Sequence, residues 1–127
     1  MIIFFSSHII YGGGELMKLR TREHDGVLII DIIGRMEDFA FEMNSIILGM
    51  LGKNTAKIVL NLEDVPYLDS NDIASLLTTW RDLTKEGIRM SIAGAKGATR
   101  QVLELTQLYS TLPMADSMED AILILAG

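Results

Sequence analysis

The sequence KIVLNLEDVPYLDSND, residues 57–72, joins the pattern of a buried strand to the pattern of a helix start. Its first half is an apolar, β-branched run, and Pro66 prevents that run from continuing as an interior strand. Apolar residues then recur at helical spacing, at Ile73, Leu76, Leu77, Trp80 and Leu83. We therefore predict a strand followed by a helix, with Ser70 at or next to the helix N-terminus.

Ser70 is the best functional candidate in this stretch. Helix N-termini expose unpaired backbone N–H groups and the positive end of the helix dipole, so they can hold an anion, including a covalently attached phosphate. The residues alone also permit a simpler role, in which Asp69 or Ser70 caps the helix and contributes roughly 1 kcal/mol. The local sequence therefore leaves two roles open for Ser70, a plain cap and a modification site.

Strand and helix patterns alternate along the rest of the chain, which predicts βαβ units around a sheet that is at least partly parallel. The predicted strands are 18–23, which could be an edge strand, 27–33, 56–62, 88–93 and a short one around Met114. The predicted helices are 38–51, 70–87, one carrying Val102, Leu105 and Tyr109, and one that opens at Ser117. The 127 residues are enough for one α/β domain.

The first sixteen residues do not resemble the rest of the chain. The apolar run at residues 2–5 is too short to cross a bilayer, and the first basic residue is Lys18, so we predict neither export nor membrane insertion. The sequence GGGEL at residues 12–16 has purine-rich codons, as a translated ribosome-binding site would have, and Met17 follows it. We therefore expect residues 1–16 to be a flexible or non-native leader and residues 17–127 to be the domain. A leader that adds an edge strand is the alternative.

The composition excludes several classes of function. The net charge is -6, with 11 Lys and Arg residues against 17 acidic residues, so the chain lacks the basic surface that nucleic-acid binding requires. The sequence has no cysteine, which excludes a disulfide, a thiolate zinc site and a cysteine nucleophile. This suits a reducing cytoplasm.

Enzymatic chemistry is also poorly supported. Glu63, Asp64, Asp69 and Asp72 resemble a carboxylate cluster for a divalent metal, but helix capping accounts for Asp69 and Asp72 without one. No lysine or arginine lies among them to hold a substrate phosphate. Ser70 lacks the G-x-S-x-G turn of a hydrolase. We therefore expect no catalytic residues, no metal and no cofactor, with a metal-dependent enzyme as a remote alternative.

The run from Ile58 to Ser70, with Ile73 and Leu76-Leu77 after it, resembles the signature of STAS domains, specifically of bacterial anti-sigma factor antagonists. Gly34, Gly87, Gly94 and the segments 102–105 and 117–121 are similar to that family in order and spacing. The likeness covers Met17 to Gly127. It implies a mixed sheet of four to five strands with helices packed mainly on one face.

The resemblance also implies a function. In that family, the unphosphorylated antagonist captures an anti-sigma factor that is also a serine kinase. Phosphorylation of the serine that corresponds to Ser70 abolishes capture until a phosphatase restores it. We expect the docking surface to be the loop 64–72 plus the outer face of the following helix, formed by Asp64, Tyr67, Asp69, Ser70, Asn71, Asp72, Ser75, Thr78, Thr79 and Asp82. A binding module of a transporter or signalling scaffold that is not phosphorylated is the alternative.

The chain departs from the family pattern at three positions. The family usually continues Asp-Ser with a small residue and then glycine, where this chain has Asn71 and Asp72. We expect Asp72 to place a charge where the kinase and ATP must approach, so these two positions weaken the prediction of phosphorylation more than the prediction of binding. Gln107 stands where glycine is common, which is a milder change.

Overall fold

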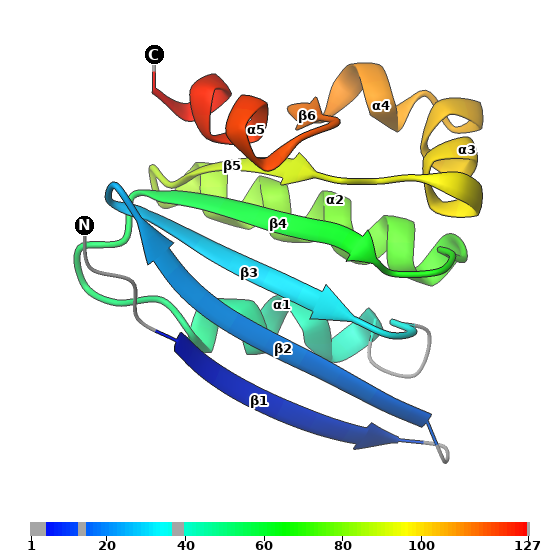
Figure 1. Cartoon of the computed structure of the whole chain (residues 1–127), viewed down its shortest axis with the longest axis horizontal. Coiled ribbons are helices and arrows are strands. Elements are labelled where there is room, and N and C mark those ends of the chain that lie inside the picture. The colour runs from blue at the N-terminus through cyan, green and yellow to red at the C-terminus, as the bar shows by residue number, and fades with distance from the viewer. Residues whose placement is uncertain (1–4, 13–14, 37–39, 127) are drawn as a thin grey trace.

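The computed structural model describes residues 5–12, 15–36 and 40–126 (Figure 1). Strands and helices alternate after an initial pair of strands. In chain order the elements are β1 (Phe5–Gly12), β2 (Glu15–His24), β3 (Val27–Ile33), α1 (Ala40–Gly49), β4 (Lys57–Asp64), α2 (Ser70–Lys85), β5 (Arg89–Ala93), α3 (Gly97–Leu105), α4 (Leu108–Thr111), β6 (Met114–Ala115) and α5 (Met118–Leu125).

The strands form one six-stranded sheet in the order β1-β2-β3-β4-β5-β6. Strands β1, β2 and β3 pair antiparallel, whereas β3 to β6 pair parallel, so the prediction of a mixed sheet is confirmed. The predicted four to five strands of the domain are confirmed by β2 to β6, and residues 5–12 of the leader add β1 as a sixth strand. Strand β2 is consequently an interior strand, and the prediction of an edge strand at 18–23 is wrong.

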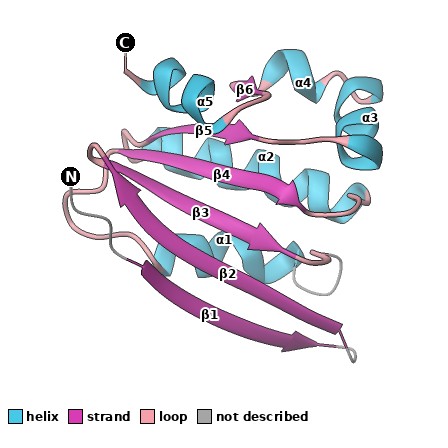
Figure 2. Ribbon diagram, in the orientation of Figure 1, coloured by secondary structure: helices cyan, strands magenta, loops and turns pink. Residues whose placement is uncertain are grey.

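Helices cover the two faces of the sheet unequally (Figure 2). The larger core lies between the sheet and α1 to α4, where side chains such as Ile30, Leu60 and Ile92 pack with Met43 of α1 and Leu76 of α2. On the opposite face, α5 alone covers a smaller cluster of Val27, Ile29, Val59 and Ala93 with Ala121 and Leu125. The prediction that helices lie mainly on one face is therefore confirmed.

The helix predicted around Val102 and Tyr109 is two helices in the structure. Helix α3 ends at Leu105, and α4 begins at Leu108. Gln107 between them has φ of +63°, a left-handed conformation that glycine adopts more readily than other residues. The backbone at position 107 therefore favours glycine, which is the residue that the family pattern commonly has there.

Candidate functional site

The loop between β4 and α2 leads to Ser70, and its inner side is packed against the core. Val65 and Leu68 are buried within the core, and the Thr99 hydroxyl of α3 donates a hydrogen bond of 2.8 Å to the Val65 carbonyl. Pro66 between them is exposed. The loop therefore has a fixed inner side and a solvent-facing outer side.

A reciprocal capping box starts α2. The Asp69 carboxylate accepts the Asp72 backbone N–H at 2.9 Å, and the Asp72 carboxylate accepts the Asp69 backbone N–H at 2.9 Å. Of the two caps that the sequence left open, the structure has Asp69. Ser70 is the first helical residue and is exposed to solvent. Its hydroxyl is therefore not needed for capping.

The predicted docking face of α2 needs a correction. Ser75 and Thr79 are 7% and 0% exposed, so they cannot contact a partner in this conformation. Asp82, on the same side of the helix, accepts a hydrogen bond of 2.6 Å from the Asn44 side chain of α1, which shows that this side of α2 faces α1. Among the predicted hydroxyls of this helix, Ser70 and Thr78 are exposed.

Asp72 is also placed differently from the prediction. It is completely buried, with its carboxylate turned back to the Asp69 backbone. It therefore presents no charge on the outer surface, and the expectation that it meets an approaching kinase is wrong.

The exposed side of the loop combines Asp64, Ser70 and Asn71 with a half-buried Tyr67 and Asp69. The Arg35 guanidinium lies over the Tyr67 ring, 5.0 Å from its centroid, and adds a cation to this surface. The sequence contained no signal for Arg35, because a contact between the loops that follow β3 and β4 depends on the parallel pairing of those strands.

A groove of about 390 Å³ lies beside the loop. Its lining comes from the end of β4 and the start of α3, namely Glu63, Asp64, Val65, Pro66, Lys96, Gly97 and Ala98. The groove adjoins the acidic side of the loop and provides a concave surface next to it.

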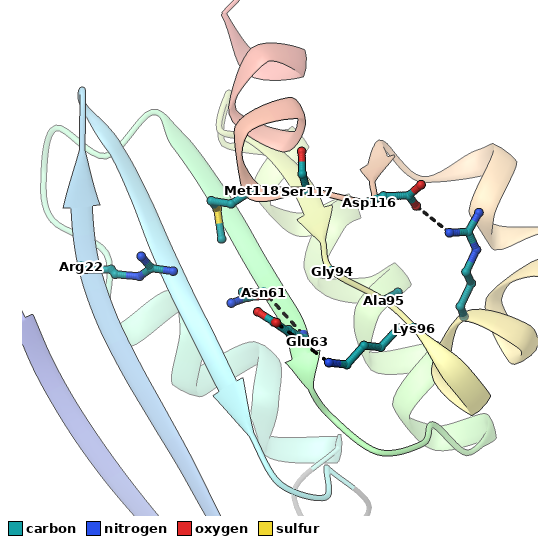
Figure 3. A pocket seen from close by; sticks show the side chains of 10 residues that line it. Arg22, Asn61, Glu63, Gly94, Ala95, Lys96, Asp116, Ser117 and Met118 are labelled. Atoms are coloured by element: carbon teal, nitrogen blue, oxygen red, sulfur yellow. Dashed lines mark hydrogen bonds and ion pairs between the residues drawn. The ribbon is translucent and has the colours of Figure 1, made fainter.

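A second cleft of about 440 Å³ lies near the N-terminus of α5 (Figure 3). Its three basic residues are all paired: Arg22 with Asp31 at 3.0 Å, Lys96 with Glu63 at 3.9 Å, and Arg100 with Asp116 at 2.7 Å. Because each cation already has a carboxylate partner, the cleft has no excess of positive charge with which to hold an anion.

Gly94 shapes this cleft. It has φ of +76°, and a Cβ atom there would lie 2.9 Å from the Asn61 side-chain oxygen and 3.2 Å from the Glu63 Cβ. The close approach of this backbone to β4 therefore requires glycine at position 94.

Asp31 lies at the centre of a network that the sequence did not predict. Its carboxylate is 2% exposed and accepts hydrogen bonds from Arg20 at 2.9 Å, Arg22 at 3.0 Å and Asn61 at 2.8 Å. Burial alone raises the pKa of Asp31, but the hydrogen bonds from Arg22, Asn61 and Arg20 together outweigh it and hold the pKa below its usual value. The only sequence signal was one acidic residue within an apolar strand.

Within the described residues, no group of three or more His, Asp or Glu side chains is placed to hold a metal ion. None of the helices in the described part of the chain has the length and apolarity needed to span a bilayer.

The family model of the STAS domain matches residues 18–121. The chain belongs to the STAS domain family. This match includes the β4–α2 loop with Ser70 and all elements from β3 to β6. It confirms the resemblance noted in the sequence.

Several proteins are similar to this chain in sequence or in structure. An anti-sigma F factor antagonist from Paenibacillus polymyxa is 19% identical over 108 residues, which are 84% of this chain and 92% of that protein. The crystal structure of an anti-sigma factor antagonist from Mycobacterium paratuberculosis is 23% identical, with a TM-score of 0.73 and coverage of 96% of both chains. A sulfate transporter family protein from Wolinella succinogenes is 19% identical, with a TM-score of 0.66 and coverage of 77% of this chain and 83% of that chain.

Proposed function

We propose that this STAS domain is an anti-sigma factor antagonist-like binding module that captures an anti-sigma factor with serine kinase activity, and that phosphorylation of Ser70 releases it. The observation that carries the proposal is the position of Ser70, exposed at the start of α2 and not used as the cap. The sequence relationship to an anti-sigma F factor antagonist supports the partner class. In this proposal the domain has no catalytic activity and works in the cytoplasm.

The charges around Ser70 favour such a switch. A phosphate adds about two negative charges at neutral pH, and its repulsion with one carboxylate of the partner roughly 6 Å away is about 1 to 3 kcal/mol. That alone lowers affinity for an acidic partner surface by about ten- to a hundredfold. The helix N-terminus stabilises the same phosphate on this chain, so modification need not unfold α2.

We propose a docking surface that is smaller than the predicted one. It comprises the exposed or half-buried members of the predicted set, Asp64, Tyr67, Asp69, Ser70, Asn71 and Thr78, with Asp82 at its edge. Asp72, Ser75 and Thr79 support this surface from inside. Asn71 and Asp72 both differ from the family pattern. Because Asp72 is buried and Asn71 is exposed, a kinase that binds here would contact Asn71.

Phosphorylation is tested with the cognate kinase and ATP. We expect the wild-type protein to incorporate one phosphate and Ser70→Ala to incorporate none, as measured by intact mass. Thr84→Ala is the matched control, because it removes an exposed hydroxyl from the same helix, outside the proposed docking surface, and should leave labelling unchanged. Equal labelling of Ser70→Ala and wild type would refute the assignment of Ser70.

Partner binding is tested separately with purified anti-sigma factor. We expect Ser70→Ala to bind like wild type and Ser70→Asp to bind about three- to tenfold more weakly, because the new carboxylate adds one charge to the loop, about half the charge of a phosphate. Titration calorimetry gives both affinities. Equal affinities for the two variants would contradict the switch.

An unphosphorylated STAS module remains the second candidate. The observations that favour it are Asn71 next to Ser70 and the shared fold of the sulfate transporter family protein. It predicts that a transporter or scaffold partner binds wild type, Ser70→Ala and Ser70→Asp without any kinase modifying the chain.

A further inference from the structure

Strand β1 forms one complete edge of the sheet (Figure 1). It pairs with β2 through all eight residues, from Phe5 opposite Arg22 to Gly12 opposite Glu15, without a register shift. Among the described residues, no strand lies on its other side. The opposite edge of the sheet is β6, which has only two residues. The open edge at β1 is therefore about 27 Å long, and its backbone N–H and C=O groups on that side are available for pairing.

The sequence of β1 lacks the features that usually prevent strands from pairing edge to edge. Such features are charged side chains, proline, bulges and short length. The strand FSSHIIYG has no charged residue and no proline, and the first charged residue of the chain is Glu15. An uncharged strand of this length is an effective template for another strand.

Strand β2 provides the contrast within the same molecule. It carries Lys18, Arg20, Arg22 and Glu23, which is the pattern of a protected edge. Strand β1 covers this charged strand and replaces it at the edge. Because of residues 5–12, the edge strand of the sheet is the uncharged β1, which permits pairing, and not the charged β2, which resists it.

We infer that β1 pairs antiparallel with β1 of a second copy, which makes a two-fold symmetric dimer with a continuous sheet across both chains. A second copy is the occupant that fits best, because an antiparallel pair of identical strands is self-complementary and needs no second binding surface. In the centred register, Ser7 of one copy lies opposite Ile10 of the other. No like charges then face each other across the new pair.

The charge distribution also favours this contact. Each chain has a net charge of -6, so two copies repel when their charged surfaces approach. At the β1 edge, the basic residues of the two β2 strands are three strand spacings apart, about 14 Å. That distance exceeds the Debye length of about 8 Å at physiological ionic strength, so their repulsion is largely screened.

The first experiment measures the mass of the full-length protein by sedimentation equilibrium over a wide range of concentration. We expect a reversible monomer–dimer equilibrium. A monomer at every concentration overturns the inference, including the case in which β1 pairs only with a strand of another protein.

Two double variants then test the register. Ser7→Glu with Ile10→Glu places introduced carboxylates opposite each other across the dimer, while Ser7 faces Arg20 within its own chain. Ser7→Glu with Ile10→Lys places opposite charges there instead. We expect the first variant to dimerise about tenfold more weakly than the second. Equal dissociation constants would exclude the antiparallel β1 contact.

A control variant tests an exposed apolar residue on another element. Leu123 of α5 is 67% exposed, and Leu123→Lys adds one charge far from β1 in the sequence and on a different element. We expect this variant to dimerise like wild type. A Leu123→Lys protein that loses the dimer would place the contact on α5 and overturn the inference. Circular dichroism of each variant confirms that it folds.

Discussion

Asp31 in β3 and Asp72 in the first turn of α2 are both almost completely buried, and different partners compensate their carboxylates. Asp31 accepts hydrogen bonds from two arginines and an asparagine. The Asp72 carboxylate accepts the backbone N–H of Asp69 at the helix N-terminus. At Asp31, two cationic side chains balance the buried negative charge. At Asp72, the carboxylate accepts a backbone N–H at the start of the helix. We expect the loss of the Asp31 carboxylate to cost more stability, because it leaves cations without their partner.

The largest effect is expected from Asp31→Ala. Breaking a fully buried pair costs about 3–5 kcal/mol, and the 41% and 30% exposure of Arg20 and Arg22 lets water compensate part of that loss. We therefore expect the free energy of unfolding to fall by about 2–3 kcal/mol in urea titrations. Asp116→Asn is the control, because Asp116 is 67% exposed and its pair with Arg100 should contribute much less. Equal effects would mean that burial of Asp31 has no energetic consequence.

The Asp31 network also predicts a dependence on pH. The folded pKa of Asp31 lies below its unfolded value, so the network stabilises the protein at neutral pH. That contribution is lost as pH falls below the unfolded value of about 3.9 and through the folded pKa. The stability difference between wild type and Asp31→Asn should therefore shrink in acid. A constant difference between neutral pH and acid would contradict the lowered pKa.

A smaller effect is expected from Asp69→Ala, which removes one half of the capping box. Loss of an N-cap costs about 1 kcal/mol, and we expect thermal unfolding to show that loss. Asp69→Asn is the matched control, since its side-chain oxygen can still accept the Asp72 backbone N–H. If both variants lose the same stability, the charge of Asp69 rather than its hydrogen bond supports the helix.

The comparison also shows which features were predictable. The α2 start was predictable because capping depends on residues three positions apart in the sequence. A partly parallel sheet was predictable from the alternation of strand and helix patterns, and the resemblance to STAS domains implied a mixed sheet. The structure confirmed both.

The unpredicted features depend on tertiary pairing. The Asp31 network needs β2, β3 and β4 side by side, and the Arg35–Tyr67 contact needs two loops that are distant in sequence. Ser75 and Thr79 were expected at the surface because a polar helix position normally faces solvent. The packing of α1 against α2 buries them.

The smallest effect on stability is expected from Ser70→Ala. Ser70 is exposed, and the cap hydrogen bonds of α2 belong to Asp69 and Asp72, so the change should stay within about 0.5 kcal/mol. Urea titration of Ser70→Ala beside Asp69→Ala makes the comparison in one experiment. A loss of about 1 kcal/mol in Ser70→Ala would show that the hydroxyl shares the capping role. If Ser70→Ala is as stable as wild type, any change in phosphorylation or partner binding reports the loop surface itself, because α2 and its cap remain intact.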